Sequence, residues 1–223
     1  MKTVGFRVTV VSIMLGLGIT VATSGLVWAA EDMSWKHEGT APEGKWTTGF
    51  RAGIALPTQQ VIDNASTSIG PAINFLTTYG LNKWINLGAM LTWQRHSIDQ
   101  KDPKADLGSL NTITLLPLYL EFRPGHFGQI QPYVSTGIGV NINSVSESDA
   151  VKRNNTTLSP GNTFAWRVAG GLDYPLTQHF LLNTEFAMNR NRGTLEVKTG
   201  GTTDKGPFDA SSMNILFGVK YIF

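Results

Sequence analysis

Seven ionisable residues fall on the polar face of alternating segments, where they could form ion pairs inside the protein. Four are basic and three are acidic: Arg51, Arg123, Arg167, Lys220, Glu121, Asp173 and Glu185. They could form either an interior salt-bridge network or a charge-selective pathway. We favour the network, because enclosed charges must pair or find water. A turn centred near residue 177 would bring Arg167 and Glu185 to the same depth, so we predict an ion pair between them.

Side chains suited to catalysis are sparse. His96 and Ser97 are adjacent, but neighbouring residues of a strand point to opposite faces, so these two cannot share a proton. The four histidines do not stand at a metal-ligand spacing: they are His37, His96, His126 and His179. The lack of cysteine excludes a thiolate zinc site and a cysteine nucleophile. We therefore expect no enzymatic activity, no catalytic residue, no bound metal and no cofactor.

The N-terminus has the features of an export signal. Lys2 and Arg7 precede a charge-free stretch over residues 8–30, and Val27 and Ala29 stand where a signal peptidase requires small residues. We expect a cleaved signal peptide over residues 1–29, and a retained anchoring helix is the alternative. The chain has 18 Lys and Arg residues, so removing these two would leave 16 against 16 Asp and Glu. A neutral mature chain argues against a nucleic-acid partner.

Eight segments alternate between apolar and polar residues with the period of a β-strand. They cover residues 46–56, 69–79, 84–98, 110–123, 133–143, 163–174, 180–189 and 212–223. Short links cover 80–83, 124–130 and 175–179, and longer polar links lie near 57–67, 99–108, 146–162 and 190–209. This layout predicts an all-β fold, an eight-stranded antiparallel transmembrane β-barrel preceded by a cleaved signal peptide. The alternative is a soluble β-sandwich, which would bury the same apolar faces.

The faces of these segments can be assigned from the alternation. In the fourth segment we assign five residues to the lipid face: Leu110, Leu116, Leu118, Leu120 and Phe122. Several residues assigned to the interior are small or apolar, which would leave room for a pocket. They are Gly53, Ala55, Ala72, Leu115 and Ala169. An eight-stranded barrel is only just wide enough for its own side chains to fill.

The last segment carries an apolar face that ends on an aromatic residue. Its outward positions are Phe217, Val219, Tyr221 and Phe223. A terminal phenylalanine with an aromatic residue two positions earlier is similar to the signal by which the barrel assembly machinery recognises its clients. We therefore expect these four residues to act as an assembly signal.

Several stretches resemble the OmpW family of small outer-membrane β-barrels, within the wider group of OmpA-like and OmpX-like eight-stranded barrels. They are Phe50-Arg51-Ala52-Gly53, Leu115-Leu116-Pro117, Gln131-Pro132-Tyr133-Val134 with Gly137 and Gly139, Ala169-Gly170-Gly171-Leu172-Asp173-Tyr174, Phe180-Leu181-Leu182-Asn183 and Gly218-Val219-Lys220-Tyr221-Ile222-Phe223. The likeness covers most of the chain after the signal peptide and is strongest from residue 115 onward.

The resemblance implies a narrow passive route for small molecules, hydrophobic ones among them. Interior Arg51, Arg167 and Glu185 would block ions, and apolar solutes would leave sideways through the wall. A structural or adhesion barrel, with a closed interior and loops that bind a partner, is the alternative. We expect a periplasmic lead-in over residues 30–45 and a barrel domain over 46–223 in the outer membrane of a Gram-negative-type cell. The expected partners are outer-membrane lipid and lipopolysaccharide, the barrel assembly machinery and small hydrophobic solutes.

Overall fold

The computed structural model describes residues 35–36, 38–59, 65–100, 105–153 and 156–223. The signal peptide predicted over residues 1–29 lies outside these ranges. Within them, no helix is both long and apolar enough to cross a membrane.

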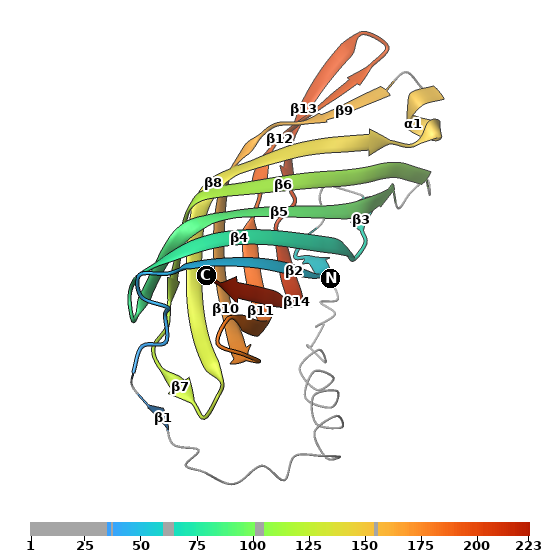
Figure 1. The fold of residues 1–223 in the computed structure, drawn as a ribbon. Helices are drawn as coiled ribbons and strands as arrows, with labels where there is room; N and C mark the ends of the chain where they lie inside the picture. The colour runs from blue at the N-terminus through green and yellow to red at the C-terminus, as the bar shows by residue number, and fades with distance from the viewer. Residues whose placement is uncertain (1–34, 37, 60–64, 101–104, 154–155) are drawn as a thin grey trace, which may run out of the picture. The chain divides into compact units, whose positions relative to one another are not determined.

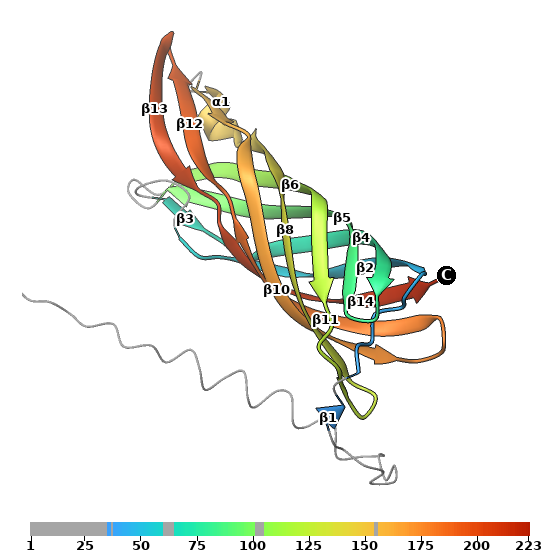
Figure 2. The same ribbon diagram turned by 90° about the vertical axis from the view of Figure 1, so that its left-hand side faces the viewer.

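Eight antiparallel strands form a closed barrel (Figures 1 and 2). They are β2 (Trp46–Pro57), β4 (Gly70–Asn82), β5 (Ile85–Gln100), β6 (Ala105–Phe122), β8 (Gln131–Glu147), β10 (Thr163–Pro175), β11 (Phe180–Arg190) and β14 (Ser212–Ile222). Each pairs with its neighbours in the chain order of these eight, β2 pairs with β14, and the β5–β6 pairing completes the ring. The predicted fold class is therefore confirmed. We call the end with the short connections the turn end and the opposite end the loop end.

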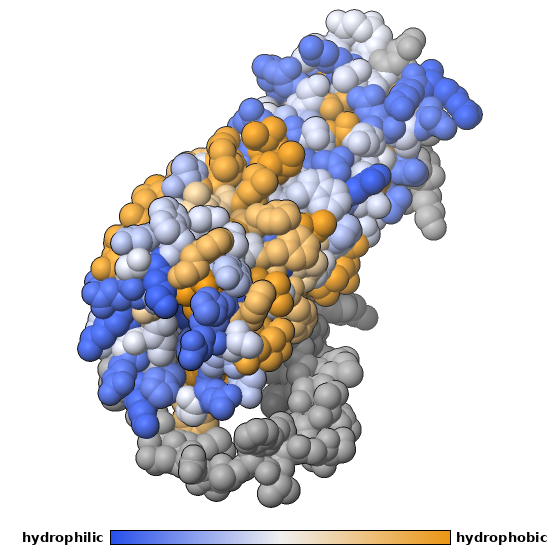
Figure 3. Space-filling model, viewed as in Figure 1, coloured by the Kyte–Doolittle hydropathy of each residue, from blue (hydrophilic) through white to orange (hydrophobic). Residues whose placement is uncertain are grey.

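Alternation along each strand separates the outer wall from the interior. On β2, Phe50 and Ile54 are exposed, whereas Arg51 and Ala55, the residues that follow each of them, are fully buried. Figure 3 shows the same division over the surface, with hydrophobic residues gathered on the wall between more hydrophilic ends. A wall of this kind suits a lipid environment, and its closed ring leaves no unpaired strand edge there.

The face assignment fails in the middle of β6. Leu110 and Leu116 lie inside the barrel with 1% and 0% exposure, whereas Leu115 lies outside with 42% exposure. The pairing of β6 with β8 shifts register between Leu115 and Leu118. Pro117 stands inside this shift and has no N–H to donate, which is why a bulge forms there. The bulge moves the alternation by one residue, so the segment before it was assigned to the wrong face.

The longer connections contain regular structure that the alternation did not predict. β12 (Arg192–Thr199) and β13 (Thr202–Asp209) form a hairpin, and β9 (Thr156–Pro160) pairs with β12 to complete a three-stranded sheet. Gly200 and Gly201 make the turn with positive φ angles of 56° and 92°. α1 (Asp149–Arg153) lies in the same region, at the loop end (Figures 1 and 2). β3 (Ala65–Thr67) pairs with β5.

The described part of the predicted lead-in lies against the turn end. β1 (Trp35–Lys36) pairs with β7 (His126–Phe127) in the connection between β6 and β8. The backbone N–H of Ala41 donates to the carbonyl oxygen of Lys83 at 2.9 Å. The boundaries given to the signal peptide, lead-in and barrel domain stay predictions.

Candidate functional site

The barrel interior brings all seven predicted ionisable residues together. Each is 2% exposed or less. They form two groups, one around the carboxylate of Glu185 and one around those of Glu121 and Asp173. The second group stands close to the turn end, because Glu121 and Asp173 are among the last residues of β6 and β10. The interior is therefore closed by charged side chains on the side of the short turns.

Glu185 accepts from two guanidinium groups. Arg51 reaches it from β2 and Arg167 from β10, and both form ion pairs with it. The hydroxyl of Tyr133 also donates to Glu185 Oε2 at 3.0 Å. Arg51 is held further by a hydrogen bond from its Nε to Asn74 Oδ1 at 2.9 Å. The Arg167–Glu185 ion pair was predicted from the sequence, whereas the contact from Arg51 across the interior was not.

Glu121 and Asp173 share the other two basic residues. Lys220 Nζ lies 3.0 Å from Glu121 Oε2 and 3.0 Å from Asp173 Oδ2. Arg123 likewise pairs with both carboxylates. The amide of Asn86 donates to Glu121 Oε1 at 3.0 Å, so the carboxylate has a neutral donor as well. Buried ion pairs need such additional hydrogen bonds to offset the cost of removing the charges from water.

Tyr133 connects the two groups. Its hydroxyl accepts from Arg51 Nη1 at 3.1 Å and from Asn183 Nδ2 at 3.0 Å. Lys220 Nζ lies 4.1 Å from the centre of its ring, in the position of a cation–π contact. From the sequence, Tyr133 was named only within a stretch that resembles the OmpW family, and no role was predicted for it. An aromatic residue on an otherwise polar interior face was the available signal.

We expect Tyr133→Phe to destabilise the folded protein by about 1 to 3 kcal/mol, because buried donors and acceptors lose their shared hydroxyl. The measurement is the midpoint of urea unfolding in lipid vesicles. Tyr174→Phe, on the exposed outer wall, is the matched control and should leave the midpoint unchanged. An unchanged midpoint for Tyr133→Phe would contradict the connecting role.

The seven charges do not cancel. Four cations face three anions, so the network carries one excess positive charge. Among the described residues, three guanidinium nitrogens in it have no hydrogen-bond partner: Arg51 Nη2, Arg123 Nη1 and Arg167 Nε. A cation crossing this part of the interior would meet a surplus of like charge, in addition to the side chains that fill the space.

Apolar and neutral polar side chains fill the rest of the interior. An apolar cluster made of Leu76, Met90, Leu116, Tyr119 and Ala165 lies beside the charged network, where the hydroxyl of Tyr119 is 3.4 Å from Glu121 Oε2. Amide and hydroxyl side chains form the next layer, in which Asn191 Nδ2 donates to Asn143 Oδ1 at 2.7 Å and Thr112 Oγ1 donates to the same oxygen at 2.9 Å. A second apolar cluster lies at the loop end: Ala65, Ile98, Leu110, Leu195, Phe208 and Ala210.

The geometry gives little support for a catalytic or metal-binding site. His96 is buried with Nδ1 3.0 Å from the carbonyl oxygen of Ser68, whereas Ser97 is exposed on the opposite face. No group of three or more His, Asp or Glu residues that could hold a metal occurs in the described ranges. The expectation that the chain is not an enzyme stays a prediction.

The predicted assembly signal lies on the outer face of β14 at the turn end. Phe217, Val219 and Phe223 are exposed to 60%, 44% and 65%. The ring of Tyr221 lies 4.9 Å from that of Phe223 and 5.0 Å from that of Phe180. These aromatic residues form part of a girdle of the kind found where a barrel wall meets the membrane surface. Recognition by the assembly machinery stays a prediction.

Comparisons with known proteins agree on the fold. The family model described as "Outer membrane protein beta-barrel domain" matches residues 9–223. The crystal structure of the outer membrane protein OprG from Pseudomonas aeruginosa is similar at 17% identity, with a TM-score of 0.66, over 81% of this chain and 97% of that one. The solid-state NMR structure of the outer membrane protein AlkL in DMPC lipid bilayers is similar at 14% identity, with a TM-score of 0.54, over 89% and 96% of the two chains. No curated protein matches the sequence.

Proposed function

Because this chain belongs to the family of outer membrane protein β-barrel domains, we propose that it is a narrow passive channel for small molecules, hydrophobic ones among them. The observation that carries the proposal is a break in the strand pairing of the wall beside an apolar part of the interior. The turn end faces the periplasm and the loop end faces the cell exterior, as the short and long connections of such barrels do.

An apolar solute would enter from the loop end. It would meet the buried apolar cluster around Ile98, Leu195 and Phe208 and would have to displace these packed side chains. Below the amide layer it would meet the second buried cluster, around Met90 and Leu116. The charged network beneath would stop it from continuing straight to the periplasm, because burying ionised groups against an apolar molecule is unfavourable.

The wall offers a sideways exit at the depth of Leu116. Near Pro117, β6 pairs irregularly with both of its neighbouring strands. Its register with β5 shifts between Gly88 and Met90, and its register with β8 shifts between Leu115 and Leu118. On the outer face beside this break lies a depression of about 170 Å³. It is lined by Leu118, Leu120, Thr136, Gly137 and Ile138.

Gly137 gives the interior side chain of Leu116 its space, and Gly139 allows the backbone of β6 to approach closely. A Cβ at Gly137 would lie 2.9 Å from Leu116 Cδ1, and one at Gly139 would lie 1.9 Å from the carbonyl oxygen of Leu115. Leu116 thus stands between the apolar interior and the break in the wall. Local separation of β6 and β8 at this break would join the two.

Uptake into liposomes tests the channel directly. Liposomes that contain the purified protein should take up apolar fluorescent solutes faster than empty liposomes, and charged solutes at the same rate as empty ones. Pro117→Ala supplies an N–H to the interrupted pairing and should slow apolar uptake by about two- to tenfold, the effect of one added hydrogen bond. Pro207→Ala, on the extracellular strand β13, is the control. Apolar uptake equal to that of empty liposomes would overturn the proposal.

The alternative is a barrel with a closed interior whose extracellular sheet binds a partner. The bonded layer of Thr112, Asn143 and Asn191 favours it, because this layer separates the two apolar clusters. Replacing Asn191 with Ala distinguishes the two functions. Apolar uptake should rise if the layer is a constriction of a channel, and should stay at the level of empty liposomes if the barrel is closed.

A further inference from the structure

The outer wall carries a depression at the loop end whose lining differs from that of the rest of the wall. Its volume is about 270 Å³, and β10, β11, the start of β12 and β14, and the residues after β2 contribute to it. Its lining includes Arg190, Arg192, Trp166 and Met188. We propose that it binds the phosphate of an anionic glycolipid of the outer leaflet, with an acyl chain of the lipid lying along the wall below it.

The position of Arg190 along β11 supports a lipid headgroup. β11 runs from Phe180, in the aromatic girdle of the turn end, to Arg190. Ten steps of about 3.4 Å, at a tilt of about 40°, correspond to a height of about 26 Å, which matches the apolar band of an outer-membrane barrel. Arg190 therefore stands at the outer membrane surface, where lipid phosphates lie.

The two arginines supply the charge that a phosphate requires. Among the described residues, no hydrogen bond or ion pair of the Arg190 side chain is found, and its position is exposed. The Nε of Arg192 lies 2.5 Å from Asp209 Oδ2, and its side chain is still 47% exposed. Two cations and one anion leave a net positive site, and guanidinium groups suit the geometry of phosphate oxygens.

The apolar side of the depression explains why a lipid fits better than free phosphate. Trp166 pairs with Arg190 across β10 and β11, and Met188 stands on the same outer face. Trp166 is 45% exposed beside Arg190, and Met188, two residues nearer the turn end on β11, is 55% exposed. A phosphate bound at Arg190 would thus place its attached acyl chain against apolar side chains, whereas inorganic phosphate would gain nothing from them.

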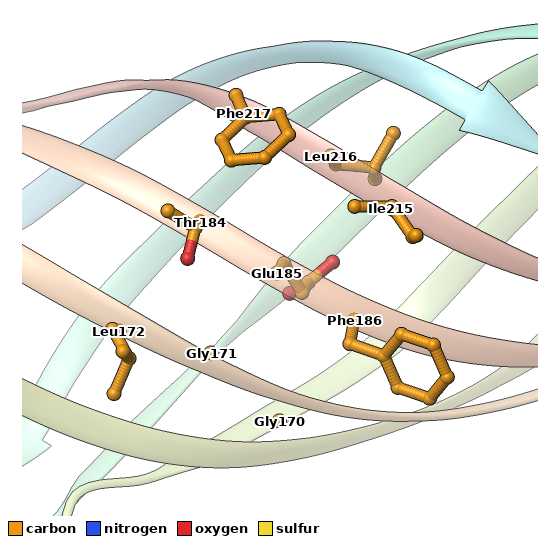
Figure 4. A pocket seen from close by; sticks show the side chains of 9 residues that line it. All are labelled: Gly170, Gly171, Leu172, Thr184, Glu185, Phe186, Ile215, Leu216 and Phe217. Atoms are coloured by element: carbon orange, nitrogen blue, oxygen red, sulfur yellow. The ribbon is translucent and has the colours of Figure 1, made fainter. Parts of the chain in front are cut away.

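A second depression on the wall provides the contrast. It measures about 320 Å³ and lies over β10, β11 and β14 (Figure 4). Its lining contains Phe186, Phe217 and the glycines 170 and 171, with no Lys or Arg among the nine described residues that form it. Its one charged residue is Glu185, which is buried in the interior ion pairs. This depression can hold a lipid tail but offers nothing to a phosphate.

Lipid A binding to the full-length protein in detergent micelles tests the proposal. The wild-type protein should bind diphosphoryl lipid A, counted by native mass spectrometry, and should bind it more tightly than lipid A from which the phosphates have been removed. Arg190→Gln should weaken binding about tenfold, because it removes one charged hydrogen-bond donor that pairs with no other residue that the structure describes. Lys198→Gln removes one positive charge from the extracellular hairpin of β12 and β13, outside the depression, and should leave binding unchanged.

Asp209→Asn gives an effect of the opposite sign. It removes the charge that competes for Arg192, and it keeps the amide oxygen that can accept from the backbone N–H of Ser211, now at 2.9 Å. Binding of diphosphoryl lipid A should therefore tighten. Equal affinity of wild type and Arg190→Gln, or an equal loss in Lys198→Gln, would overturn the site. Competition by millimolar inorganic phosphate that is as effective as lipid A would overturn the assignment to a lipid.

Discussion

Replacing Glu185 with Gln is expected to lower the free energy of unfolding by about 3 to 5 kcal/mol, the usual cost of breaking a buried ion pair. The carboxylate is shared by Arg51 and Arg167, and all three side chains are 1% exposed or less. Without it, two guanidinium groups stay buried beside a neutral amide, and the excess positive charge of the interior rises from one to two. The measurement is the urea concentration at half-unfolding in lipid vesicles, followed by the change in gel mobility.

Two further variants separate charge imbalance from loss of a side-chain contact. Glu185→Gln combined with Arg167→Gln restores the original net charge and should recover part of the lost stability. Glu196→Gln removes an exposed carboxylate that Lys205 pairs with on the extracellular hairpin, and should leave the midpoint unchanged. A midpoint for Glu185→Gln equal to that of wild type would mean that water solvates this part of the interior.

A disulfide across the break in the wall is expected to abolish apolar uptake. Leu118 and Ile138 are partners in the pairing of β6 with β8, immediately beside Pro117. Because the protein has no cysteine, Leu118→Cys with Ile138→Cys introduces the only thiols. Directly paired antiparallel residues are within the distance that a disulfide spans. Once oxidised, the bond would hold the two strands together and prevent the wall from opening at this place.

The effect of the disulfide on uptake should be reversible. Uptake of apolar solutes should fall to the level of empty liposomes on oxidation and return on reduction. Phe186→Cys with Ile215→Cys forms the equivalent bond between β11 and β14, elsewhere in the wall, and should leave uptake unchanged. Full uptake through the oxidised Leu118–Ile138 variant would contradict a sideways exit at Pro117.

The strands were predictable because lipid favours apolar side chains on the outer wall. Most residues that face lipid are apolar, so an alternation with a period of two marks the eight strands, and the seven interior charges could be assigned from it. Their partners were harder to predict. Glu121 on β6 meets Lys220 on β14, and Arg51 on β2 meets Glu185 on β11, although neither pair of strands is adjacent. Such contacts depend on the width and tilt of the closed barrel, which no single strand encodes.

Two predictions were wrong, the faces assigned in β6 and the polar loop expected at β12 and β13, and both errors come from relying on this alternation. Extending the two-residue alternation across Pro117 assigned Leu110, Leu115 and Leu116 to the wrong faces. A proline inside a strand is itself a sign of a bulge. The hairpin of β12 and β13 was interpreted as a polar loop. Outside the membrane both of its faces can be polar, so the alternation that marks the other strands is weak there.

The interior ion pairs link distant parts of the chain, and this determines how the protein can fold. Arg51 belongs to the first strand of the barrel, whereas Glu185 and Lys220 belong to the last two. A chain that has formed all but its final strands would hold buried arginines without carboxylates, which is costly. Completion of the charge network and closure of the ring between β2 and β14 must therefore occur together. Contacts of such high sequence separation make this closure slow and all-or-none, so a chain truncated before β11 should not form a stable partial barrel.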